Sequence, residues 1–207
     1  MGDGFAPELR HVTGARRFSQ AIAEGDGISI VVHVDDAGAA RAAEEQGAEA
    51  VALLRPFGGL SETTSLPVLW RPHGSPEQAR AAGADACVLA LALLDDEDGE
   101  LERSYRAAVE LGLDCVVEVR DDQELERALE RIDPEIFLLA GNGEDDAGPL
   151  EHALELLPDV PAGKLALAEV DTSVPDEVAE LERAGMDGVI VPAGNVAELA
   201  GGAEPQV

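Results

Sequence analysis

Basic residues are scarce in this chain of 207 residues. Lysine and arginine together number 14 against 43 aspartates and glutamates, which gives a formal net charge of -29. A surface of that sign repels phosphate backbones and anionic lipids, so we expect neither a nucleic-acid nor a membrane partner. Lysine occurs once, at Lys164, a usage that fits either a GC-rich coding sequence or a salt-adapted bacterial or archaeal proteome.

Cysteine and long apolar runs are also rare. The only two cysteines, Cys87 and Cys115, lie inside apolar segments, so we expect reduced, buried thiols rather than a disulfide. The longest apolar run, residues 88–94, is far shorter than the roughly 20 residues of a membrane-spanning helix. The first residues lack the basic region and apolar core of a signal peptide. These features predict a cytoplasmic protein.

Short apolar runs alternate with amphipathic stretches from residue 28 almost to the C-terminus. Runs that are apolar throughout are typical of parallel strands with both faces covered. The predicted strands are residues 28–33, 50–54, 67–70, 86–90, 115–119, 136–140, 165–169 and 188–191. Apolar residues at three- and four-residue spacing predict helices over residues 37–46, 100–111, 123–131, 150–157 and 175–184.

Eight strands joined by helical crossovers predict an α/β fold, a single (βα)8 TIM barrel. An open doubly wound sheet is the alternative, but it usually has a glycine-rich phosphate turn after its first strand. Here His33-Val34-Asp35-Asp36 follows instead. The barrel is lean: we expect a helical lead-in over residues 1–25, the barrel over residues 26–200 and a frayed tail over residues 201–207.

Several segments carry a resemblance to one known family. Leu66-Pro67-Val68-Leu69 and the stretch 78–86 look like strand three, helix three and strand four of indole-3-glycerol-phosphate synthase. Residues 111–119 are similar to that family's fifth strand, which ends in a glutamate. Ala168-Glu169 resembles the end of its seventh strand, and residues 185–191 resemble its eighth. The resemblance runs from about residue 17 to residue 199 in this order and spacing.

The resemblance implies a carbon–carbon lyase of tryptophan biosynthesis, which closes an indole ring by decarboxylating and dehydrating a carboxyphenylamino deoxyribulose phosphate. That family uses no metal or cofactor, and a lysine at the end of strand three is its general acid. By position, Glu118 and Glu169 match its glutamates of strands five and seven, and Arg71 replaces the lysine. Asn142 lies one or two positions beyond its strand-six asparagine. Its strand-one glutamate and lysine have no counterpart, since only His33 is strongly polar there.

These departures predict weak or lost ring-closing activity. Arginine stays protonated at every physiological pH, so Arg71 can hold a carboxylate but donates a proton poorly. Val170-Asp171 and Pro192-Ala193 occupy the positions of the family's phosphate-binding turns. A proline there removes an amide donor, and an aspartate places negative charge where the phosphate would bind.

Polar residues collect where the predicted strands end, which in a (βα)8 barrel is the rim that holds the active site. They predict either a positive pocket for a small carboxylated or phosphorylated molecule or a set of Arg–Glu pairs that closes the barrel mouth. The candidate catalytic residues are Glu118, Glu169 and Arg71. The candidate substrate-binding residues are His33, Arg55, His73, Arg120 and Asn142.

Two functions stay open. As an enzyme, the chain would act on an anionic sugar-like substrate, with Glu118 and Glu169 as acid–base or orienting groups and Arg71 as the anion anchor. Alternatively, it is a barrel without catalysis that binds a small anion or a partner protein. The family resemblance favours the first function, and the missing strand-one residues favour the second.

A metal site is a weaker hypothesis. His33, His73, Glu118 and Glu169 are residue types that bind divalent metals, but no local motif supports the set, so we expect no metal. The acidic stretches 95–98 and 144–146 lack the ligand spacing of an EF-hand, and we expect solvated loops there.

Overall fold

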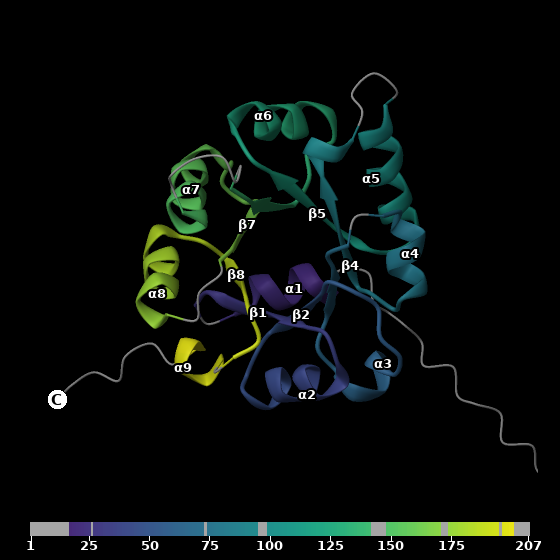
Figure 1. Ribbon diagram of the computed structural model, residues 1–207. Coiled ribbons are helices and arrows are strands. Elements are labelled where there is room, and N and C mark those ends of the chain that lie inside the picture. Colours follow the sequence, from purple (N-terminus) through teal and green to yellow (C-terminus); the bar gives the residue numbers. More distant parts are fainter. Residues whose placement is uncertain are drawn as a thin grey trace, which may run out of the picture.

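In the computed structural model, eight parallel strands close into a barrel that is ringed by helices (Figure 1). The structure describes residues 17–25, 27–72, 74–94, 99–141, 148–170, 174–194 and 196–200. Each strand pairs with the next one along the chain, and β1 also pairs with β8. The predicted (βα)8 barrel is therefore confirmed. The expected tail, residues 201–207, lies outside the described residues.

The elements follow the predicted order. The strands are β1 (Ser29–Val34), β2 (Ala50–Leu53), β3 (Val68–Trp70), β4 (Ala86–Ala90), β5 (Asp114–Val119), β6 (Ile136–Leu139), β7 (Leu165–Glu169) and β8 (Gly188–Val191). The α-helices are α1 (Arg17–Ala23), α2 (Ala37–Glu45), α3 (Leu60–Thr63), α4 (Pro76–Ala81), α5 (Glu100–Glu110), α6 (Asp122–Arg131), α7 (Pro149–Leu156), α8 (Pro175–Ala184) and α9 (Val196–Ala200). Two 3-10 turns follow β4 and α7: η1 (Leu91–Leu93) and η2 (Leu157–Asp159). Every strand end lies within one residue of its predicted position.

Side chains alternate between the two faces of each strand, which separates the apolar core into two parts. One part packs between the strands and the outer helices. The other fills the barrel, and it includes a layer with one buried residue from each odd-numbered strand: Val31, Leu69, Val116 and Leu167. Such four-residue layers from alternate strands are typical of this fold. The interior of the barrel is therefore a packed core. The next inward-facing residues, two positions further along the odd-numbered strands, lie at the mouth of the barrel.

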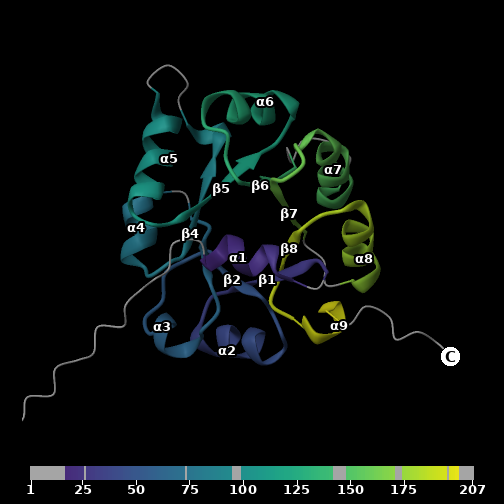
Figure 2. The same cartoon turned by 180° about the vertical axis from the view of Figure 1, so that it is seen from behind.

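Helix α1 closes the end of the barrel where the strands begin, and both views along the barrel place it in the middle (Figures 1 and 2). Phe18 and Ile22 are buried and belong to the core inside the barrel. At the start of β8, Gly188 leaves room for this packing, since a Cβ there would lie 3.6 Å from Ile22 and 3.2 Å from Leu167. The floor is thus filled, and the mouth lies at the opposite end.

Carboxylates at the helix-to-strand junctions bind amides of the preceding strand. Glu49 accepts from an amide of β1 at 2.8 Å, Asp85 from one of β3 at 3.0 Å and Asp187 from one of β7 at 2.8 Å. Each acid lies two residues after a glycine with positive φ that ends a helix. These contacts join consecutive strands in pairs at the floor.

The two cysteines are buried, free thiols, as predicted, and they lie opposite each other on β4 and β5. Burial and the neighbouring Cys87 raise the pKa of the Cys115 thiol well above its usual range. No helix in the described part of the chain is both long enough and apolar enough to cross a membrane.

Candidate functional site

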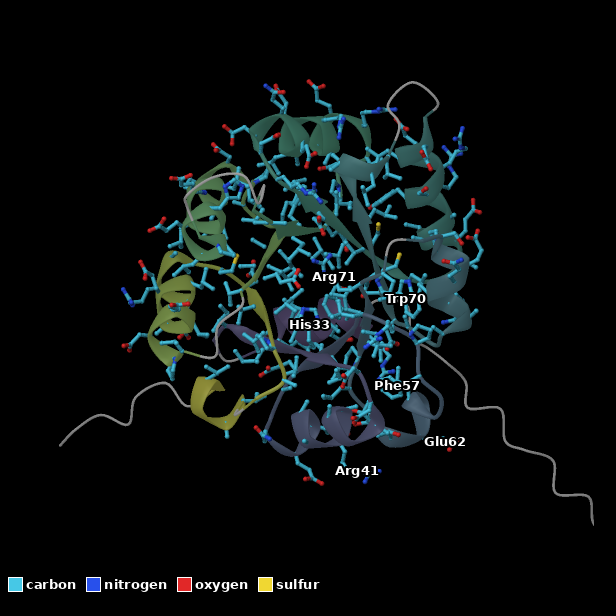
Figure 3. All side chains as sticks on the ribbon, viewed as in Figure 1. His33, Arg41, Phe57, Glu62, Trp70 and Arg71 are labelled. Atoms are coloured by element: carbon cyan, nitrogen blue, oxygen red, sulfur yellow. The ribbon has the colours of Figure 1, made fainter. Side chains whose placement is uncertain are left out.

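Four polar side chains follow the inner apolar layer, two residues further along each odd-numbered strand. They are His33 on β1, Arg71 directly after β3, Glu118 on β5 and Glu169 on β7. We call them the mouth quartet. Because side chains alternate, the i+2 step places them on the inner face at the C-terminal ends of the strands. Figure 3 shows His33 and Arg71 near the middle of the barrel.

Arg71 bridges the two glutamates. Its amide donates to the carbonyl of Leu53 at 3.0 Å, so the residue continues the pairing of β3 with β2. Its Nη1 donates to Oε2 of Glu118 at 2.6 Å, and its Nη2 donates to Oε2 of Glu169. Burial alone would lower the pKa of this guanidinium, but the charges of Glu169 and Glu118 outweigh burial and raise it. Arg71 is therefore a fixed cation.

Glu118 lies between two guanidinium groups. Its side chain is 5% exposed, and its second oxygen, Oε1, accepts from Nη2 of Arg120 at 3.2 Å. The backbone of Arg120 is held on both sides: its N–H donates to Glu124 at 2.8 Å, and its carbonyl lies 2.7 Å from Nε2 of His152 on α7. The predicted role of Arg120 at the rim thus depends on a loop that other side chains position.

Glu169 connects Arg71 to His33. Its Oε1 lies 2.7 Å from Nε2 of His33. Burial raises the pKa of Glu169, but the hydrogen bond with His33 and the charge of Arg71 lower it below its ordinary value. Because a carboxylate faces Nε2, neutral His33 carries its proton on that atom. Nδ1 of His33 and Nε of Arg71 are buried and have no hydrogen-bond partner among the described residues.

The mouth is therefore a series of hydrogen bonds and ion pairs that runs from His33 through Glu169, Arg71 and Glu118 to Arg120. Two guanidinium groups balance two carboxylates. In this arrangement the protein's own glutamates occupy the donors of Arg71 that would bind an anion. Three surface cavities of about 310, 550 and 400 Å³ lie elsewhere, against α5, around Lys164 and against α6.

The other predicted site residues lie apart from the mouth quartet and Arg120, or they lie outside the described residues. Arg55 is exposed, and within the described ranges no residue contacts its side chain by an ion pair or hydrogen bond. His73 and Asn142 lie outside the described residues, as do Asp171 and the acidic stretches 95–98 and 144–146. Among the residues described, no three His, Cys, Asp or Glu side chains are grouped to hold a metal ion.

His152 and Glu124 were missed by reasoning from the sequence. A signal for Glu124 exists: Asp121 caps α6 by accepting from the amide of Glu124 at 2.8 Å, the Asp-x-x-Glu pattern of a capping box. The contact of His152 depends on how α7 lies beside the loop after β5, which no local pattern specifies.

Residues 76–195, more than half of the chain, match the family model described as indole-3-glycerol phosphate synthase. The curated indole-3-glycerol phosphate synthase of Salinibacter ruber is 35% identical over 118 residues, which are 55% of this chain and 42% of that protein. That of Pelodictyon phaeoclathratiforme is 34% identical over 136 residues, 64% and 52% of the two chains. That of Nocardioides sp. is 40% identical over 114 residues, 55% and 43%. The chain spans about half the length of these relatives, and the family match begins after Arg71.

Proposed function

This chain belongs to the indole-3-glycerol phosphate synthase family, and we propose that it binds an anionic substrate of that kind at the barrel mouth while closing the indole ring weakly or not at all. The observation that carries the proposal is the position of Arg71. It stands where the resemblance places a general-acid lysine, and it is held between Glu118 and Glu169.

Anion binding is supported by the chemistry of the mouth. Arg71 and Arg120 are two planar donors that match carboxylate or phosphate groups, in a chain with 14 basic residues in all. A carboxylated or phosphorylated ligand that reached Arg71 would replace one of its glutamate partners. The carboxyphenylamino deoxyribulose phosphate implied by the resemblance has both kinds of group.

Weak ring closure follows from the missing proton donor. Dehydration requires a group that protonates the departing hydroxyl, and a well-placed general acid contributes roughly 10²- to 10⁴-fold to the rate. Arg71 keeps its proton because its pKa is raised. Glu169 has a lowered pKa, so at neutral pH it is a carboxylate that accepts rather than donates. The glutamates can still orient the substrate.

The test is turnover of that substrate by the purified chain, followed by indole fluorescence at low and at molar salt. Both conditions are needed because a net charge of -29 repels itself unless it is screened. We expect a rate about 10²- to 10⁴-fold below that of a family member with the lysine. Substrate binding should be lost in Arg71→Met. A rate equal to that of the lysine enzyme would contradict the proposal.

The pairing of both mouth glutamates also favours a second function, binding of a small anion without any catalysis. Substrate binding that depends on Arg71, with no indole formed by folded protein at either salt concentration, would select this function. Circular dichroism in the same buffers shows whether the protein is folded.

A further inference from the structure

The two carboxylates that hold Arg71 are not equivalent. Glu118 is 5% exposed and also binds Arg120, whereas Glu169 is 26% exposed and its other partner is His33. Freeing a deeply buried carboxylate from a cation costs more than freeing one that water reaches. An anion that binds Arg71 therefore displaces Glu169 rather than Glu118.

That displacement changes the charge balance of the mouth. With His33 neutral, the two arginines and two glutamates sum to zero, so an added anion leaves one uncompensated negative charge. Such a charge is costly among side chains that are mostly buried. Nδ1 of His33 is a buried ring nitrogen without a hydrogen-bond partner among the described residues, so His33 is the member of the mouth quartet with an open position for a proton.

The described residues that flank His33 in the sheet are apolar, so few other groups could take up this proton. In the sheet His33 pairs with Ala52 of β2, and the adjacent Val32 pairs with Val191 of β8, so the flanking strands present apolar residues. Asp35 and Asp36 follow on the same segment, but both are exposed, and Asp36 caps α2. Within the described ranges, Glu169 is the charged group that touches the imidazole, and Arg71 acts on it through Glu169.

We propose that an anion binds Arg71 in place of Glu169 and that His33 takes up one proton from solvent in the same step. The proton goes to Nδ1, because Nε2 already donates to Glu169. The released glutamate then pairs with the imidazolium, and the mouth stays neutral. This inference rests on the proposed anion binding and adds that the binding is linked to pH through one residue.

The experiment uses the full chain and 2-aminobenzoate, a fluorescent aromatic carboxylate that is ionised above about pH 6. Calorimetric titration in two buffers of different ionisation enthalpy gives the number of protons taken up for each anion bound. We expect close to one at neutral pH, and an affinity that falls by up to about tenfold for each pH unit above neutrality. His33→Gln keeps an N–H donor for Glu169 but cannot titrate, so its affinity should not change with pH.

Glu155→Gln is the control, since it removes an exposed titratable side chain from α7 and leaves the pair of His33 and Glu169 intact. It should take up protons as the wild type does. The imidazole C–H resonance of His33 in the wild type is a second measure, which does not depend on whether a variant folds. This resonance should move to its protonated position when the anion is added.

The outcomes separate the two proposals. Binding that is lost in Arg71→Met but takes up no proton would overturn the role of His33 and leave the anion site standing. Proton uptake that persists in His33→Gln would likewise overturn the role of His33 and leave the anion site standing. If no binding depends on Arg71 at any pH, the anion site itself is wrong, and the role of His33 fails with it.

Discussion

Ser19 and Asp114 join the first helix to the floor of the barrel: the N–H of Ser19 donates to Oδ2 of Asp114 at 2.8 Å, and both residues are buried. Burial raises the pKa of Asp114 even though it accepts this hydrogen bond. The hydrogen bond from Ser19 offsets part of the cost of burying this carboxylate, and it fixes α1 to the start of β5. The floor of the barrel depends on a helix that precedes its first strand.

Phe18→Ala should lower the free energy of unfolding by about 3–5 kcal/mol, since Phe18 is fully buried inside the barrel and its removal leaves a cavity. Gln20→Ala, on the exposed side of the same helix, should change it by less than about 0.5 kcal/mol. Urea unfolding followed by circular dichroism at molar salt measures both. Equal small effects would show that α1 contributes little to the core.

Asp187→Ala should lower the free energy of unfolding by about 1–3 kcal/mol, because it removes the carboxylate that accepts from the N–H of Ala166 at 2.8 Å. Asp187→Asn keeps a carbonyl oxygen in the same place and should cost less. The two variants differ mainly in that acceptor, so unfolding curves that coincide would contradict the role assigned to the junction carboxylates.

Arg71→Lys should raise the rate of ring closure by up to about 10²-fold, because a buried ammonium group can be tuned towards neutral pH and a guanidinium cannot. The readout is indole fluorescence at saturating substrate. Arg120→Lys makes the same chemical change at the neighbouring guanidinium and should bring no gain. An Arg71→Lys protein that folds, binds substrate and is no faster would count against the proposal that the missing general acid weakens ring closure.

Glu169→Gln should reduce stability at neutral pH and have less effect in acid. Burial raises the pKa of Glu169, but His33 and Arg71 lower it below its ordinary value of 4.5. A carboxyl with a lowered pKa in the folded state contributes stability that is present above its unfolded-state pKa and is lost as the pH falls through the folded-state value. Wild type and variant should therefore converge in urea unfolding below about pH 4.

The matched control for that series is Glu155→Gln, which removes an exposed carboxyl from α7. Its effect should be small and nearly constant with pH, because an exposed charge loses little solvation on folding. A Glu169→Gln effect that stayed the same from pH 7 to pH 3 would show that the carboxylate's ion pairs are not its source.

Most strands could be predicted to within one residue because they are apolar runs that lie between a helix end and a polar residue, as β3 and β5 show. The same pattern placed His33 and Glu118 at the mouth, since each is the polar residue near the end of such a run. Arg55 also follows a strand, but Ala50 and Ala52 of that strand face the barrel interior, so residue 55 falls on the outer parity. Counting parity from the apolar residues would have separated Arg55 from Arg71.

The pairing of side chains could not be predicted in the same way. The sequence shows that α1 is amphipathic, but which end of the barrel it covers depends on contacts between residues far apart in the chain, such as Ser19 and Asp114. The bridge from Glu118 through Arg71 to Glu169 joins three strands, and no spacing along the chain specifies it. Local patterns determine which residues reach the mouth, and tertiary packing determines their partners.

The mouth quartet combines residues from two segments of the barrel, one outside and one inside the stretch that matches the family model. His33 and Arg71 come from the first three strands, outside the stretch that matches the family model, whereas Glu118 and Glu169 come from strands within it. A charge change in either part alone would leave a buried partner uncompensated in the other. Close descendants of this sequence should therefore alter positions 33 and 71 together with 118 and 169, so that the two parts evolve as one electrostatic unit.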